Sequence, residues 1–409
     1  MRDEGWDERL HRADAGAIYL HVPFCARKCA YCDFASWATP GDDPAMPRYR
    51  DALMRQLGEA SELGLVGNAA TAYVGGGTPT LLGAGLGRLA ARVRAVAPCV
   101  EELSCEANPD SLSDEVLACA AEAGVTRLSI GVQSLADEEL VQLGRIHDAA
   151  CARERVSEAV SAGFDVSVDL MCATPLQTRE SWRETLLGAL GLGVGHVSVY
   201  PLAIEEGTAL ARRVGDDDPA WNDTAVQAER MTDAERLLED AGLMRYEVAS
   251  YARTGHACRH NVAYWTGVPY LGLGTGAASM LAREGYERLR GVCEALPAAP
   301  DDAVRARLVC TTGRAELAGL ADAAFDVEFL TLREAVAEDL MLGARLVSGL
   351  DPVLVVFARG IVGDALDDTL WGCLLDGLLV ERDGRMAPTR KGWLLGNDLF
   401  GRLWDLAGR

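Results

Sequence analysis

The strongest constraint on this chain is an alternation between short β-rich runs and helical patterns over residues 17–205. It predicts an α/β fold with a parallel sheet, because each parallel strand needs a helical crossover back to the same end. Right-handed crossovers curve six such units into an open, partial (β/α)6 barrel. The predicted strands are 17–22, 71–77, 102–108, 126–134, 165–171 and 196–202, and the predicted helices are 47–63, 84–95, 111–123, 137–143, 149–162 and 178–190.

The rest of the chain is expected to form three further parts. Residues 1–16 are an N-terminal extension, and residues 331–409 a small C-terminal α+β domain. In that domain a helix near 367–376, two short strands around Asp383-Gly384 and a final helix predict a winged-helix-like unit. Residues 206–330 extend the barrel, with a helix near 221–241, a strand-like RYEVASYA, a loop through CRHNVAYW and irregular chain over 290–330.

Net charge and hydropathy limit the binding partners and the cellular location that we expect for this chain. The net charge of −22 argues against binding to nucleic acid or to an anionic membrane surface, and the winged-helix-like unit is not strongly basic. No apolar run is long enough for an integral membrane segment, and the charged N-terminus lacks a signal-peptide core. We therefore expect a soluble cytoplasmic protein, either a monomer or a homodimer.

Three cysteines stand out from the twelve in the chain. Cys25, Cys29 and Cys32 lie in CARKCAYC, directly after the first predicted strand, and the other nine are scattered as expected for small buried residues. A structural zinc site needs four ligands, and a four-iron cluster normally takes four thiolates. Three thiolates leave one iron with an open coordination position. An open position is where a small molecule can bind and react, so the missing fourth cysteine is informative. The alternatives are a chance zinc site or an inert loop.

The other predicted strand ends support a site at this edge of the barrel. Polar or glycine residues follow the strands at GGGTPT, Glu106, Gln133 and Asp169. Ligand sites of parallel α/β sheets gather at the carboxyl ends of the strands. Glycines let the backbone approach a ligand closely, and we expect the N–H groups of GGGTPT to be free to bind one.

The C-x3-C-x2-C spacing resembles the radical S-adenosylmethionine (SAM) superfamily. The resemblance is specific to its coproporphyrinogen III oxidase-like family, through IYLHVPFCARKCAYCDF, YVGGGTPTLL, CEANPDSL, RLSIGVQSL, LGRIHD, VDLM, IEEGTAL and CRHNVAYW. It implies a radical SAM barrel in which SAM chelates the open iron, and the cluster supplies the electron that cleaves SAM to a 5′-deoxyadenosyl radical.

The resemblance also implies roles for individual residues. Cys25, Cys29 and Cys32 match the cluster ligands, and nine others match SAM contacts or neighbours of the cluster: Tyr19 at the end of the first strand, Tyr31, Gly76, Gly77, Thr78, Glu106, Gln133, Arg145 and Asp169. Carboxylates suit ribose hydroxyls or the ammonium group, and arginine suits the methionyl carboxylate. For Arg145 and Asp169 the alternative is an ordinary ion pair or a helix-end charge.

Within that family the chain is more similar to the heme-chaperone branch than to the dehydrogenase branch. Phe34 replaces an extra cysteine of the dehydrogenases, and only 24 residues precede Cys25. The segment HNVAYW matches a motif associated with heme binding, which implies His260, Asn261, Tyr264 and Trp265 as heme-motif residues. His256 and Cys258 are other candidate heme ligands. The alternative is that His260 and Asn261 only bond the backbone of a long loop.

Two functions follow from this resemblance. The first is a heme chaperone that binds a [4Fe-4S] cluster, SAM and heme and passes the heme to an acceptor protein. The second is an oxidoreductase, the oxygen-independent coproporphyrinogen III dehydrogenase, with a porphyrinogen ligand. The chain departs from the family pattern G-x-P-G-Q-T at Ala173 and Leu176, and has Ala278 where the family often has a histidine.

Overall fold

The structure is a computed structural model that describes residues 6–214 and 223–408. Its centre is a run of six parallel strands in sequence order, which confirms the predicted barrel. The strands are β1 (Ala17–Val22), β4 (Thr71–Gly76), β5 (Glu102–Ala107), β6 (Arg127–Gln133), β7 (Asp165–Cys172) and β8 (His196–Pro201). No helix within the described ranges is long and apolar enough to cross a membrane.

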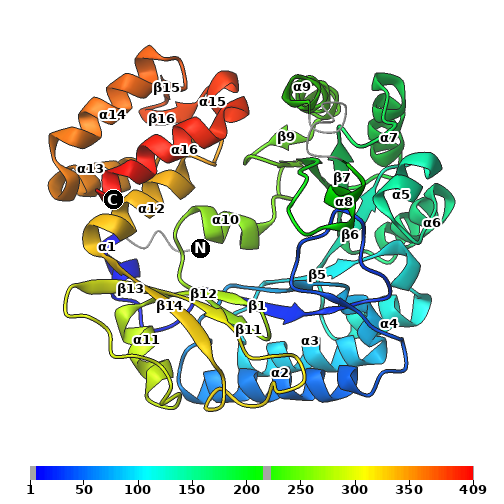
Figure 1. Ribbon diagram of the computed structural model, residues 1–409, viewed down its shortest axis with the longest axis horizontal. Helices are drawn as coiled ribbons and strands as arrows, with labels where there is room; N and C mark the ends of the chain where they lie inside the picture. The colour runs from blue at the N-terminus through cyan, green and yellow to red at the C-terminus, as the bar shows by residue number, and fades with distance from the viewer. Residues whose placement is uncertain (1–5, 215–222, 409) are drawn as a thin grey trace.

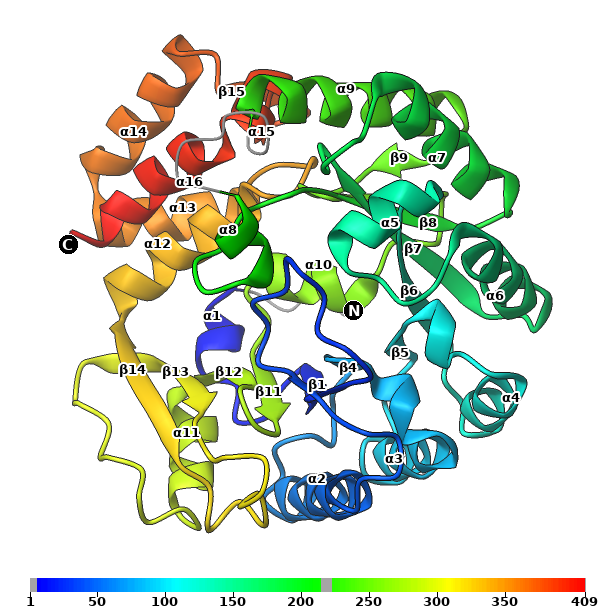
Figure 2. The same cartoon turned by 45° about the vertical axis from the view of Figure 1, so that its right-hand side comes forward.

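Helices cover the outer side of this sheet (Figures 1 and 2). They are α2 (Ala45–Glu62), α3 (Ala84–Val96), α4 (Asp114–Glu122), α5 (Asp137–Leu143), α6 (Ala149–Ser161), α7 (Arg179–Gly191) and α9 (Thr224–Asp240). Side-chain caps fix several of their starts: the Ser113 hydroxyl accepts the Val116 N–H in α4, and the Asp148 carboxylate accepts the Cys151 N–H in α6. The predicted helix near 221–241 begins two residues outside the described part and is otherwise confirmed.

The sheet is wider than the sequence predicts, with twelve strands in all among the described residues. Beyond β1 lie β11 (Tyr270–Leu273), β12 (Ala278–Ala282), β13 (Ala303–Cys310) and β14 (Phe325–Thr331), and beyond β8 lie β10 (Ser250–Ala252) and β9 (Met244–Arg245). Residues 290–330 were predicted to be irregular, which is confirmed for 291–302 and 311–324 but is wrong for β13 and β14. Arg305 and Arg307 interrupt the apolar pattern of β13, but they form ion pairs with Glu338 of α12 (Leu332–Gly343).

The segment HNVAYW is also misassigned by sequence. It was predicted as loop and instead forms helix α10 (Arg259–Trp265). The Glu102 carboxylate, on the first residue of β5, accepts the backbone N–H groups of Arg259 and His260 and so caps the helix. A cap supplied from so far away in the sequence leaves no local signal.

The C-terminal part contains α12 (Leu332–Gly343), α13 (Pro352–Val362), α14 (Asp364–Leu375), α15 (Arg390–Leu394) and α16 (Gly396–Trp404). The predicted pair of strands is present as the hairpin β15 (Leu379–Arg382) and β16 (Arg385–Pro388). Asp383 and Gly384 form its two-residue turn with φ of 52° and 75°, as such turns require. Buried apolar residues of this part form a cluster of their own, joined by Trp6 and Leu10 of α1 (Trp6–Leu10). The boundary near Thr331 stays a prediction.

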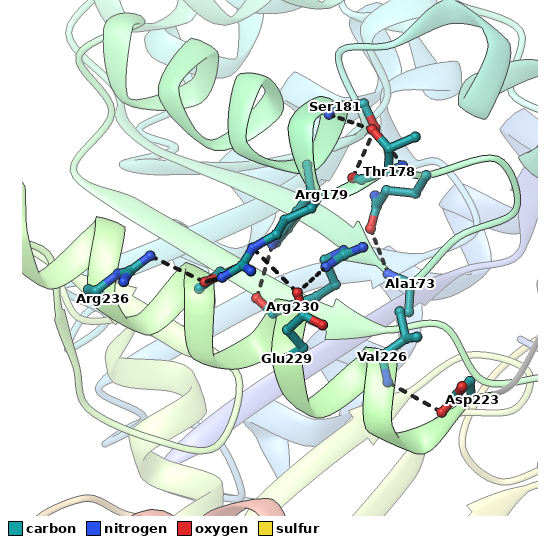
Figure 3. A network of polar contacts seen from close by, with 12 residues as sticks. Ala173, Thr178, Arg179, Ser181, Asp223, Val226, Glu229, Arg230 and Arg236 are labelled. Carbon is teal, nitrogen blue, oxygen red and sulfur yellow. Dashed lines mark hydrogen bonds and ion pairs between the residues drawn. The ribbon is translucent and has the colours of Figure 1, made fainter.

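The loop between β7 and α7 runs between Ala173 and Thr178, which are labelled in Figure 3, and two of its residues have a positive φ. Ala173 and Leu176 adopt φ of 57° and 65°, at the two positions where the family pattern has glycine. The loop is held in place by the Gln177 side chain, which accepts the Ala173 N–H at 2.7 Å and donates to Glu139. A side chain with a Cβ costs about 1 kcal/mol in this region of φ.

We therefore predict that Leu176→Gly stabilises the protein by about 1 kcal/mol, because Leu176 is exposed and loses no packing. The measurement is the midpoint of chemical denaturation. Leu187→Gly, at an exposed position inside α7, is the matched control and is expected to lower the midpoint. A lower midpoint for Leu176→Gly would show that the left-handed conformation carries no strain there.

Candidate functional site

The three clustered cysteines lie on a loop that two short strands hold at the carboxyl end of the barrel. These are β2 (Phe24–Cys25) and β3 (Trp37–Ala38), which pair in parallel. The loop is also tied to the end of α5, because the Ala30 N–H donates to the Leu143 carbonyl at 2.9 Å. We refer to residues 25–36 as the cysteine loop.

Cys25, Cys29 and Cys32 line one cavity of about 500 Å³ inside the barrel, which we call the inner cavity. No three His, Cys, Asp or Glu side chains in the described ranges are close enough to hold a single metal ion. A four-iron cluster takes one thiolate on each ligated iron, so three thiols that line one cavity fit a cluster with one open iron. Arg145 donates to the Cys29 sulfur at 3.2 Å.

The glycine motif packs directly under the cysteine loop. A Cβ on Gly77 would lie 2.6 Å from the Phe24 carbonyl oxygen and 2.9 Å from the Cys25 sulfur. The prediction that the N–H groups of this motif are free is wrong. Gly77 and Thr78 donate to the carbonyls of Val22 and Phe24, and Gly76 donates to the Glu106 carboxylate. The motif therefore positions the loop, and contact of Gly76, Gly77 and Thr78 with SAM stays a prediction.

A histidine that sequence analysis missed links the barrel to the cysteine loop. Tyr19 was predicted at the end of the first strand, but it lies in the middle of β1. Its hydroxyl contacts the His21 Nδ1 at 3.0 Å, and the His21 Nε2 lies 2.9 Å from the Ala35 carbonyl oxygen. Since burial lowers the pKa of His21, the ring is neutral and donates to Ala35 from Nε2.

Two buried carboxylates, Glu106 and Asp169, line the inner cavity. Burial raises the pKa of Glu106 to about 7, although the Gly76 N–H opposes the shift. Burial likewise raises the pKa of Asp169 to about 6, against hydrogen bonds from the serines at 129 and 198. Both carboxylates are therefore poised to gain from donors on a bound ligand, since ribose hydroxyls or an ammonium group favour the ionised form.

The remaining predicted SAM contacts also line the inner cavity. Gln133 ends β6 with φ of 66° at a register shift, and it lines the cavity in the same alternate series as Ser129 and Gly131. Arg145 is buried and donates to the Asn108 side chain and the Gly131 carbonyl. Tyr31 lies beside Arg145 and the cysteines, and burial raises its pKa.

The opposite end of the barrel is closed by residues 256–264, which we call the barrel floor. It contacts the first residues of four strands. The carboxylate of Glu102 caps α10, and the Thr71 hydroxyl lies 2.9 Å from the His260 Nδ1. Asp165 lies 2.9 Å from the His256 Nδ1, and Arg127 donates to the His256 carbonyl. The inner cavity thus extends from the cysteine loop to α10.

The heme-motif residues are divided between two sides of α10. His260, Asn261 and Tyr264 line the inner cavity, whereas Trp265 lines a second cavity outside the barrel. His260 is 1% exposed, and its two ring nitrogens contact Thr71 and Tyr264. Burial lowers the pKa of His260 to about 3, so the ring is neutral. Ligation of iron by His260 would require it to leave both partners, and it stays a prediction.

The two alternative heme ligands are also engaged in the floor. His256 pairs with Asp165, and the Cys258 thiol donates to Glu102 at 3.6 Å. Cys258 is 3% exposed, and burial raises the pKa of its thiol to about 12.

Sequence analysis missed the inward-facing residues within the strands. Those that line the inner cavity are Tyr73, Ser129, Ser167, His196, Ser198 and Tyr200, together with Asn108 directly after β5. His21 was missed as well. A signal was present: alternate positions hold Arg, Ser, Gly and Gln in RLSIGVQ, Asp, Ser, Asp and Met in DVSVDLM, and His, Ser and Tyr in HVSVYP. Alternate residues of a strand share one face of the sheet, so this period assigns them to the barrel interior.

Comparison with known proteins agrees with this geometry. The profile of the radical SAM superfamily matches residues 19–187. The solved structure of coproporphyrinogen III oxidase (HemN) from Escherichia coli, a radical SAM enzyme, shares the fold with a TM-score of 0.73, over 98% of this chain and 94% of that one, at 22% identity. The fold and the cysteine loop define a radical SAM protein.

Relatives of similar length narrow the assignment. The heme chaperone HemW of Mycobacterium tuberculosis is 36% identical over 384 residues, which cover 92% of both chains. The heme chaperone HemW of Lactococcus lactis is 30% identical over 399 residues, covering 94% of this chain and 96% of the relative. The chain belongs to the HemW family of radical SAM proteins.

Gly77→Ala is predicted to reduce the iron and sulfide content of the reconstituted protein several-fold, because the added Cβ displaces Cys25. Gly41→Ala is the control, since a Cβ at Gly41 meets nothing within 4 Å. Both variants are compared by circular dichroism to confirm folding. Full cluster content in Gly77→Ala would mean that the close approach of Gly77 to Cys25 does not position the ligand.

A second prediction concerns pH. The folded protein favours protonated Glu106, whose pKa of about 7 exceeds the ordinary 4.5. Its stabilising effect is therefore present below pH 4.5 and is lost as the pH rises through 7. The cofactor-free protein should melt at a higher temperature at pH 5 than at pH 8. This group should contribute on the order of 1 kcal/mol to the difference in the free energy of unfolding. Glu106→Gln should shrink that difference, and the exposed Glu115→Gln should leave it unchanged.

Proposed function

We propose that this protein is a heme chaperone, which holds a [4Fe-4S] cluster and SAM in the inner cavity, binds heme, and passes the heme to an acceptor protein. The observation that carries the proposal is the end-to-end similarity to proteins named heme chaperone HemW, covering 92% and 94% of this chain in the two comparisons above. The radical SAM superfamily implies the cluster and SAM. Heme binding and heme transfer are the further steps that the proposal adds.

The inner cavity fits the two cofactors. Cys25, Cys29 and Cys32 hold the cluster from the loop side, and the glycine motif supports that loop from beneath. Arg145 is placed to pair with a carboxylate near Cys29, and Glu106 and Asp169 to accept hydroxyl or ammonium donors deeper in the barrel. When bound, the cluster and SAM supply one-electron chemistry.

We propose an indirect role for His260 in heme binding. Its ring bridges Thr71 of β4 and Tyr264 of α10, and its face stacks on Tyr73 with ring centroids 5.2 Å apart. These contacts fix the helix against the strands. The position of Trp265, which lies on the outer side of the same helix, depends on them.

The test is an anaerobic titration of the cluster-reconstituted protein with heme, followed by absorbance, and then mixing of the complex with apomyoglobin as the probe acceptor. The expected results are saturation at about one heme per chain and formation of holomyoglobin from the complex. The rate of holomyoglobin formation is expected to differ between samples with and without SAM. Absence of stoichiometric heme binding contradicts the proposal. Formation of protoporphyrinogen from coproporphyrinogen III in an anaerobic assay with SAM would favour the dehydrogenase function instead.

His260→Ala is predicted to leave the position of the heme absorption band unchanged and to lower protein stability by about 1–3 kcal/mol, the cost of breaking buried hydrogen bonds. Tyr264→Phe removes one of the two partners and should have a smaller effect. The measurements are the absorption spectrum of the heme complex and the thermal midpoint. A shifted band in His260→Ala with an unshifted band in Tyr264→Phe would instead identify His260 as the iron ligand.

A further inference from the structure

A second large cavity, of about 770 Å³, lies on the outer side of α10, and we call it the outer cavity. Its walls come from α1, α10, the connection between α12 and α13, and the hairpin β15–β16. Figure 1 shows α10 between the barrel strands and the C-terminal helices. The volume lies within the range of roughly 300–1,000 Å³ that small-molecule sites occupy.

One wall of the outer cavity is apolar and contains an aromatic plane. Val262 and Trp265 of α10 line it together with Leu346 and Leu354. The guanidinium of Arg345 lies 5.1 Å from the centre of the Trp265 ring, a cation–π contact that fixes the ring. Such a wall favours a flat, apolar ligand, because a flat ligand can stack on the indole ring and bury a large apolar area against it.

The hairpin contributes positive charge to the outer cavity. The side chains of Arg382 and Arg385 flank the hairpin turn and form no hydrogen bond or ion pair within the described ranges, although the two residues pair through their backbones in the hairpin. Two of the carboxylates in the cavity wall are already engaged: Asp339 accepts from Arg305 and Trp6, and Asp351 caps α13. Asp383, exposed at the turn between the two arginines, offsets one of their charges. Unpaired arginines beside an apolar wall are suited to a ligand that carries carboxylates.

The usual ligands of heme iron are absent from the described residues of this cavity. Among the described residues that line it there is no His, Cys or Met. The hydroxyl of Tyr246, the remaining candidate, lies 3.0 Å from the His196 Nε2 and accepts the Cys258 N–H. Recognition in this cavity therefore acts on the organic part of a ligand and not on a metal at its centre.

We propose that the outer cavity binds the tetrapyrrole, with the macrocycle against Trp265 and its propionates on Arg382 and Arg385. This inference rests on the proposed function and adds the place and the mode of binding. The inner cavity has to hold the cluster and SAM within about 500 Å³, so the tetrapyrrole lies on the other side of α10. One helix thereby touches both sites, through His260, Asn261 and Tyr264 inside and Trp265 outside.

The experiment compares binding of heme and of metal-free protoporphyrin IX to the full-length, cluster-reconstituted protein. Two variants alter the outer cavity: the double variant Arg382→Glu/Arg385→Glu, and Val262→Trp, which fills it from α10. The control Arg288→Glu/Arg290→Glu makes the same change in net charge on α11 (Arg283–Arg290), away from both cavities. Both cavity variants are expected to weaken binding of both ligands by about tenfold or more, and the control by less than about twofold.

Three results would overturn the inference. Heme binding that is unchanged in both cavity variants places the heme elsewhere and leaves the chaperone function standing. Binding of heme without binding of protoporphyrin IX shows that an iron ligand is required, which the outer cavity lacks. Failure of the unaltered protein to bind either tetrapyrrole rejects the proposed function together with the cavity.

Discussion

The alternation of residues within the six parallel strands is the constraint on which the rest of the structure depends. Leu128, Ile130 and Val132 of β6 are buried under the outer helices, whereas Ser129 and Gly131 face the interior. The same division runs through β7 and β8. Apolar packing on one face holds the barrel together, so the interior is free to carry serines, carboxylates and tyrosines. The barrel therefore encloses a polar cavity where a packed apolar core would otherwise lie.

This cavity is closed at its two ends by segments that are anchored in different ways. The cysteine loop is held by backbone pairing of β2 with β3, by the glycine motif and by His21. The floor is held by charges on the first residues of the strands, chiefly Glu102 and Asp165. A loop fixed by backbone contacts suits a permanent cluster. A floor fixed by side-chain contacts is the end at which a ligand on the far side of α10 can be coupled to the interior.

How much of this could be read from the sequence depends on the range of the signals. The six strands, the hairpin at Asp383 and the cysteine loop were predicted because spacing, period and turn residues are local. Helix α10 was missed because the residue that caps it lies 157 and 158 positions away from the two N–H groups that it accepts. Strand β13 was missed because its arginines are neutralised by a later helix. The division of HNVAYW between two cavities is a tertiary property that no local pattern contains.

The central claim is that α10 separates the cluster from the tetrapyrrole. The most direct test is the distance between the reduced cluster and copper(II) protoporphyrin bound in place of heme, measured by pulsed dipolar electron paramagnetic resonance. Strands of six residues, such as β1, separate the two ends of the barrel by about 20 Å. The account predicts a separation of about 20 Å or more. A distance of about 10 Å or less would place the tetrapyrrole inside the barrel, beside the cysteine loop, and would contradict it.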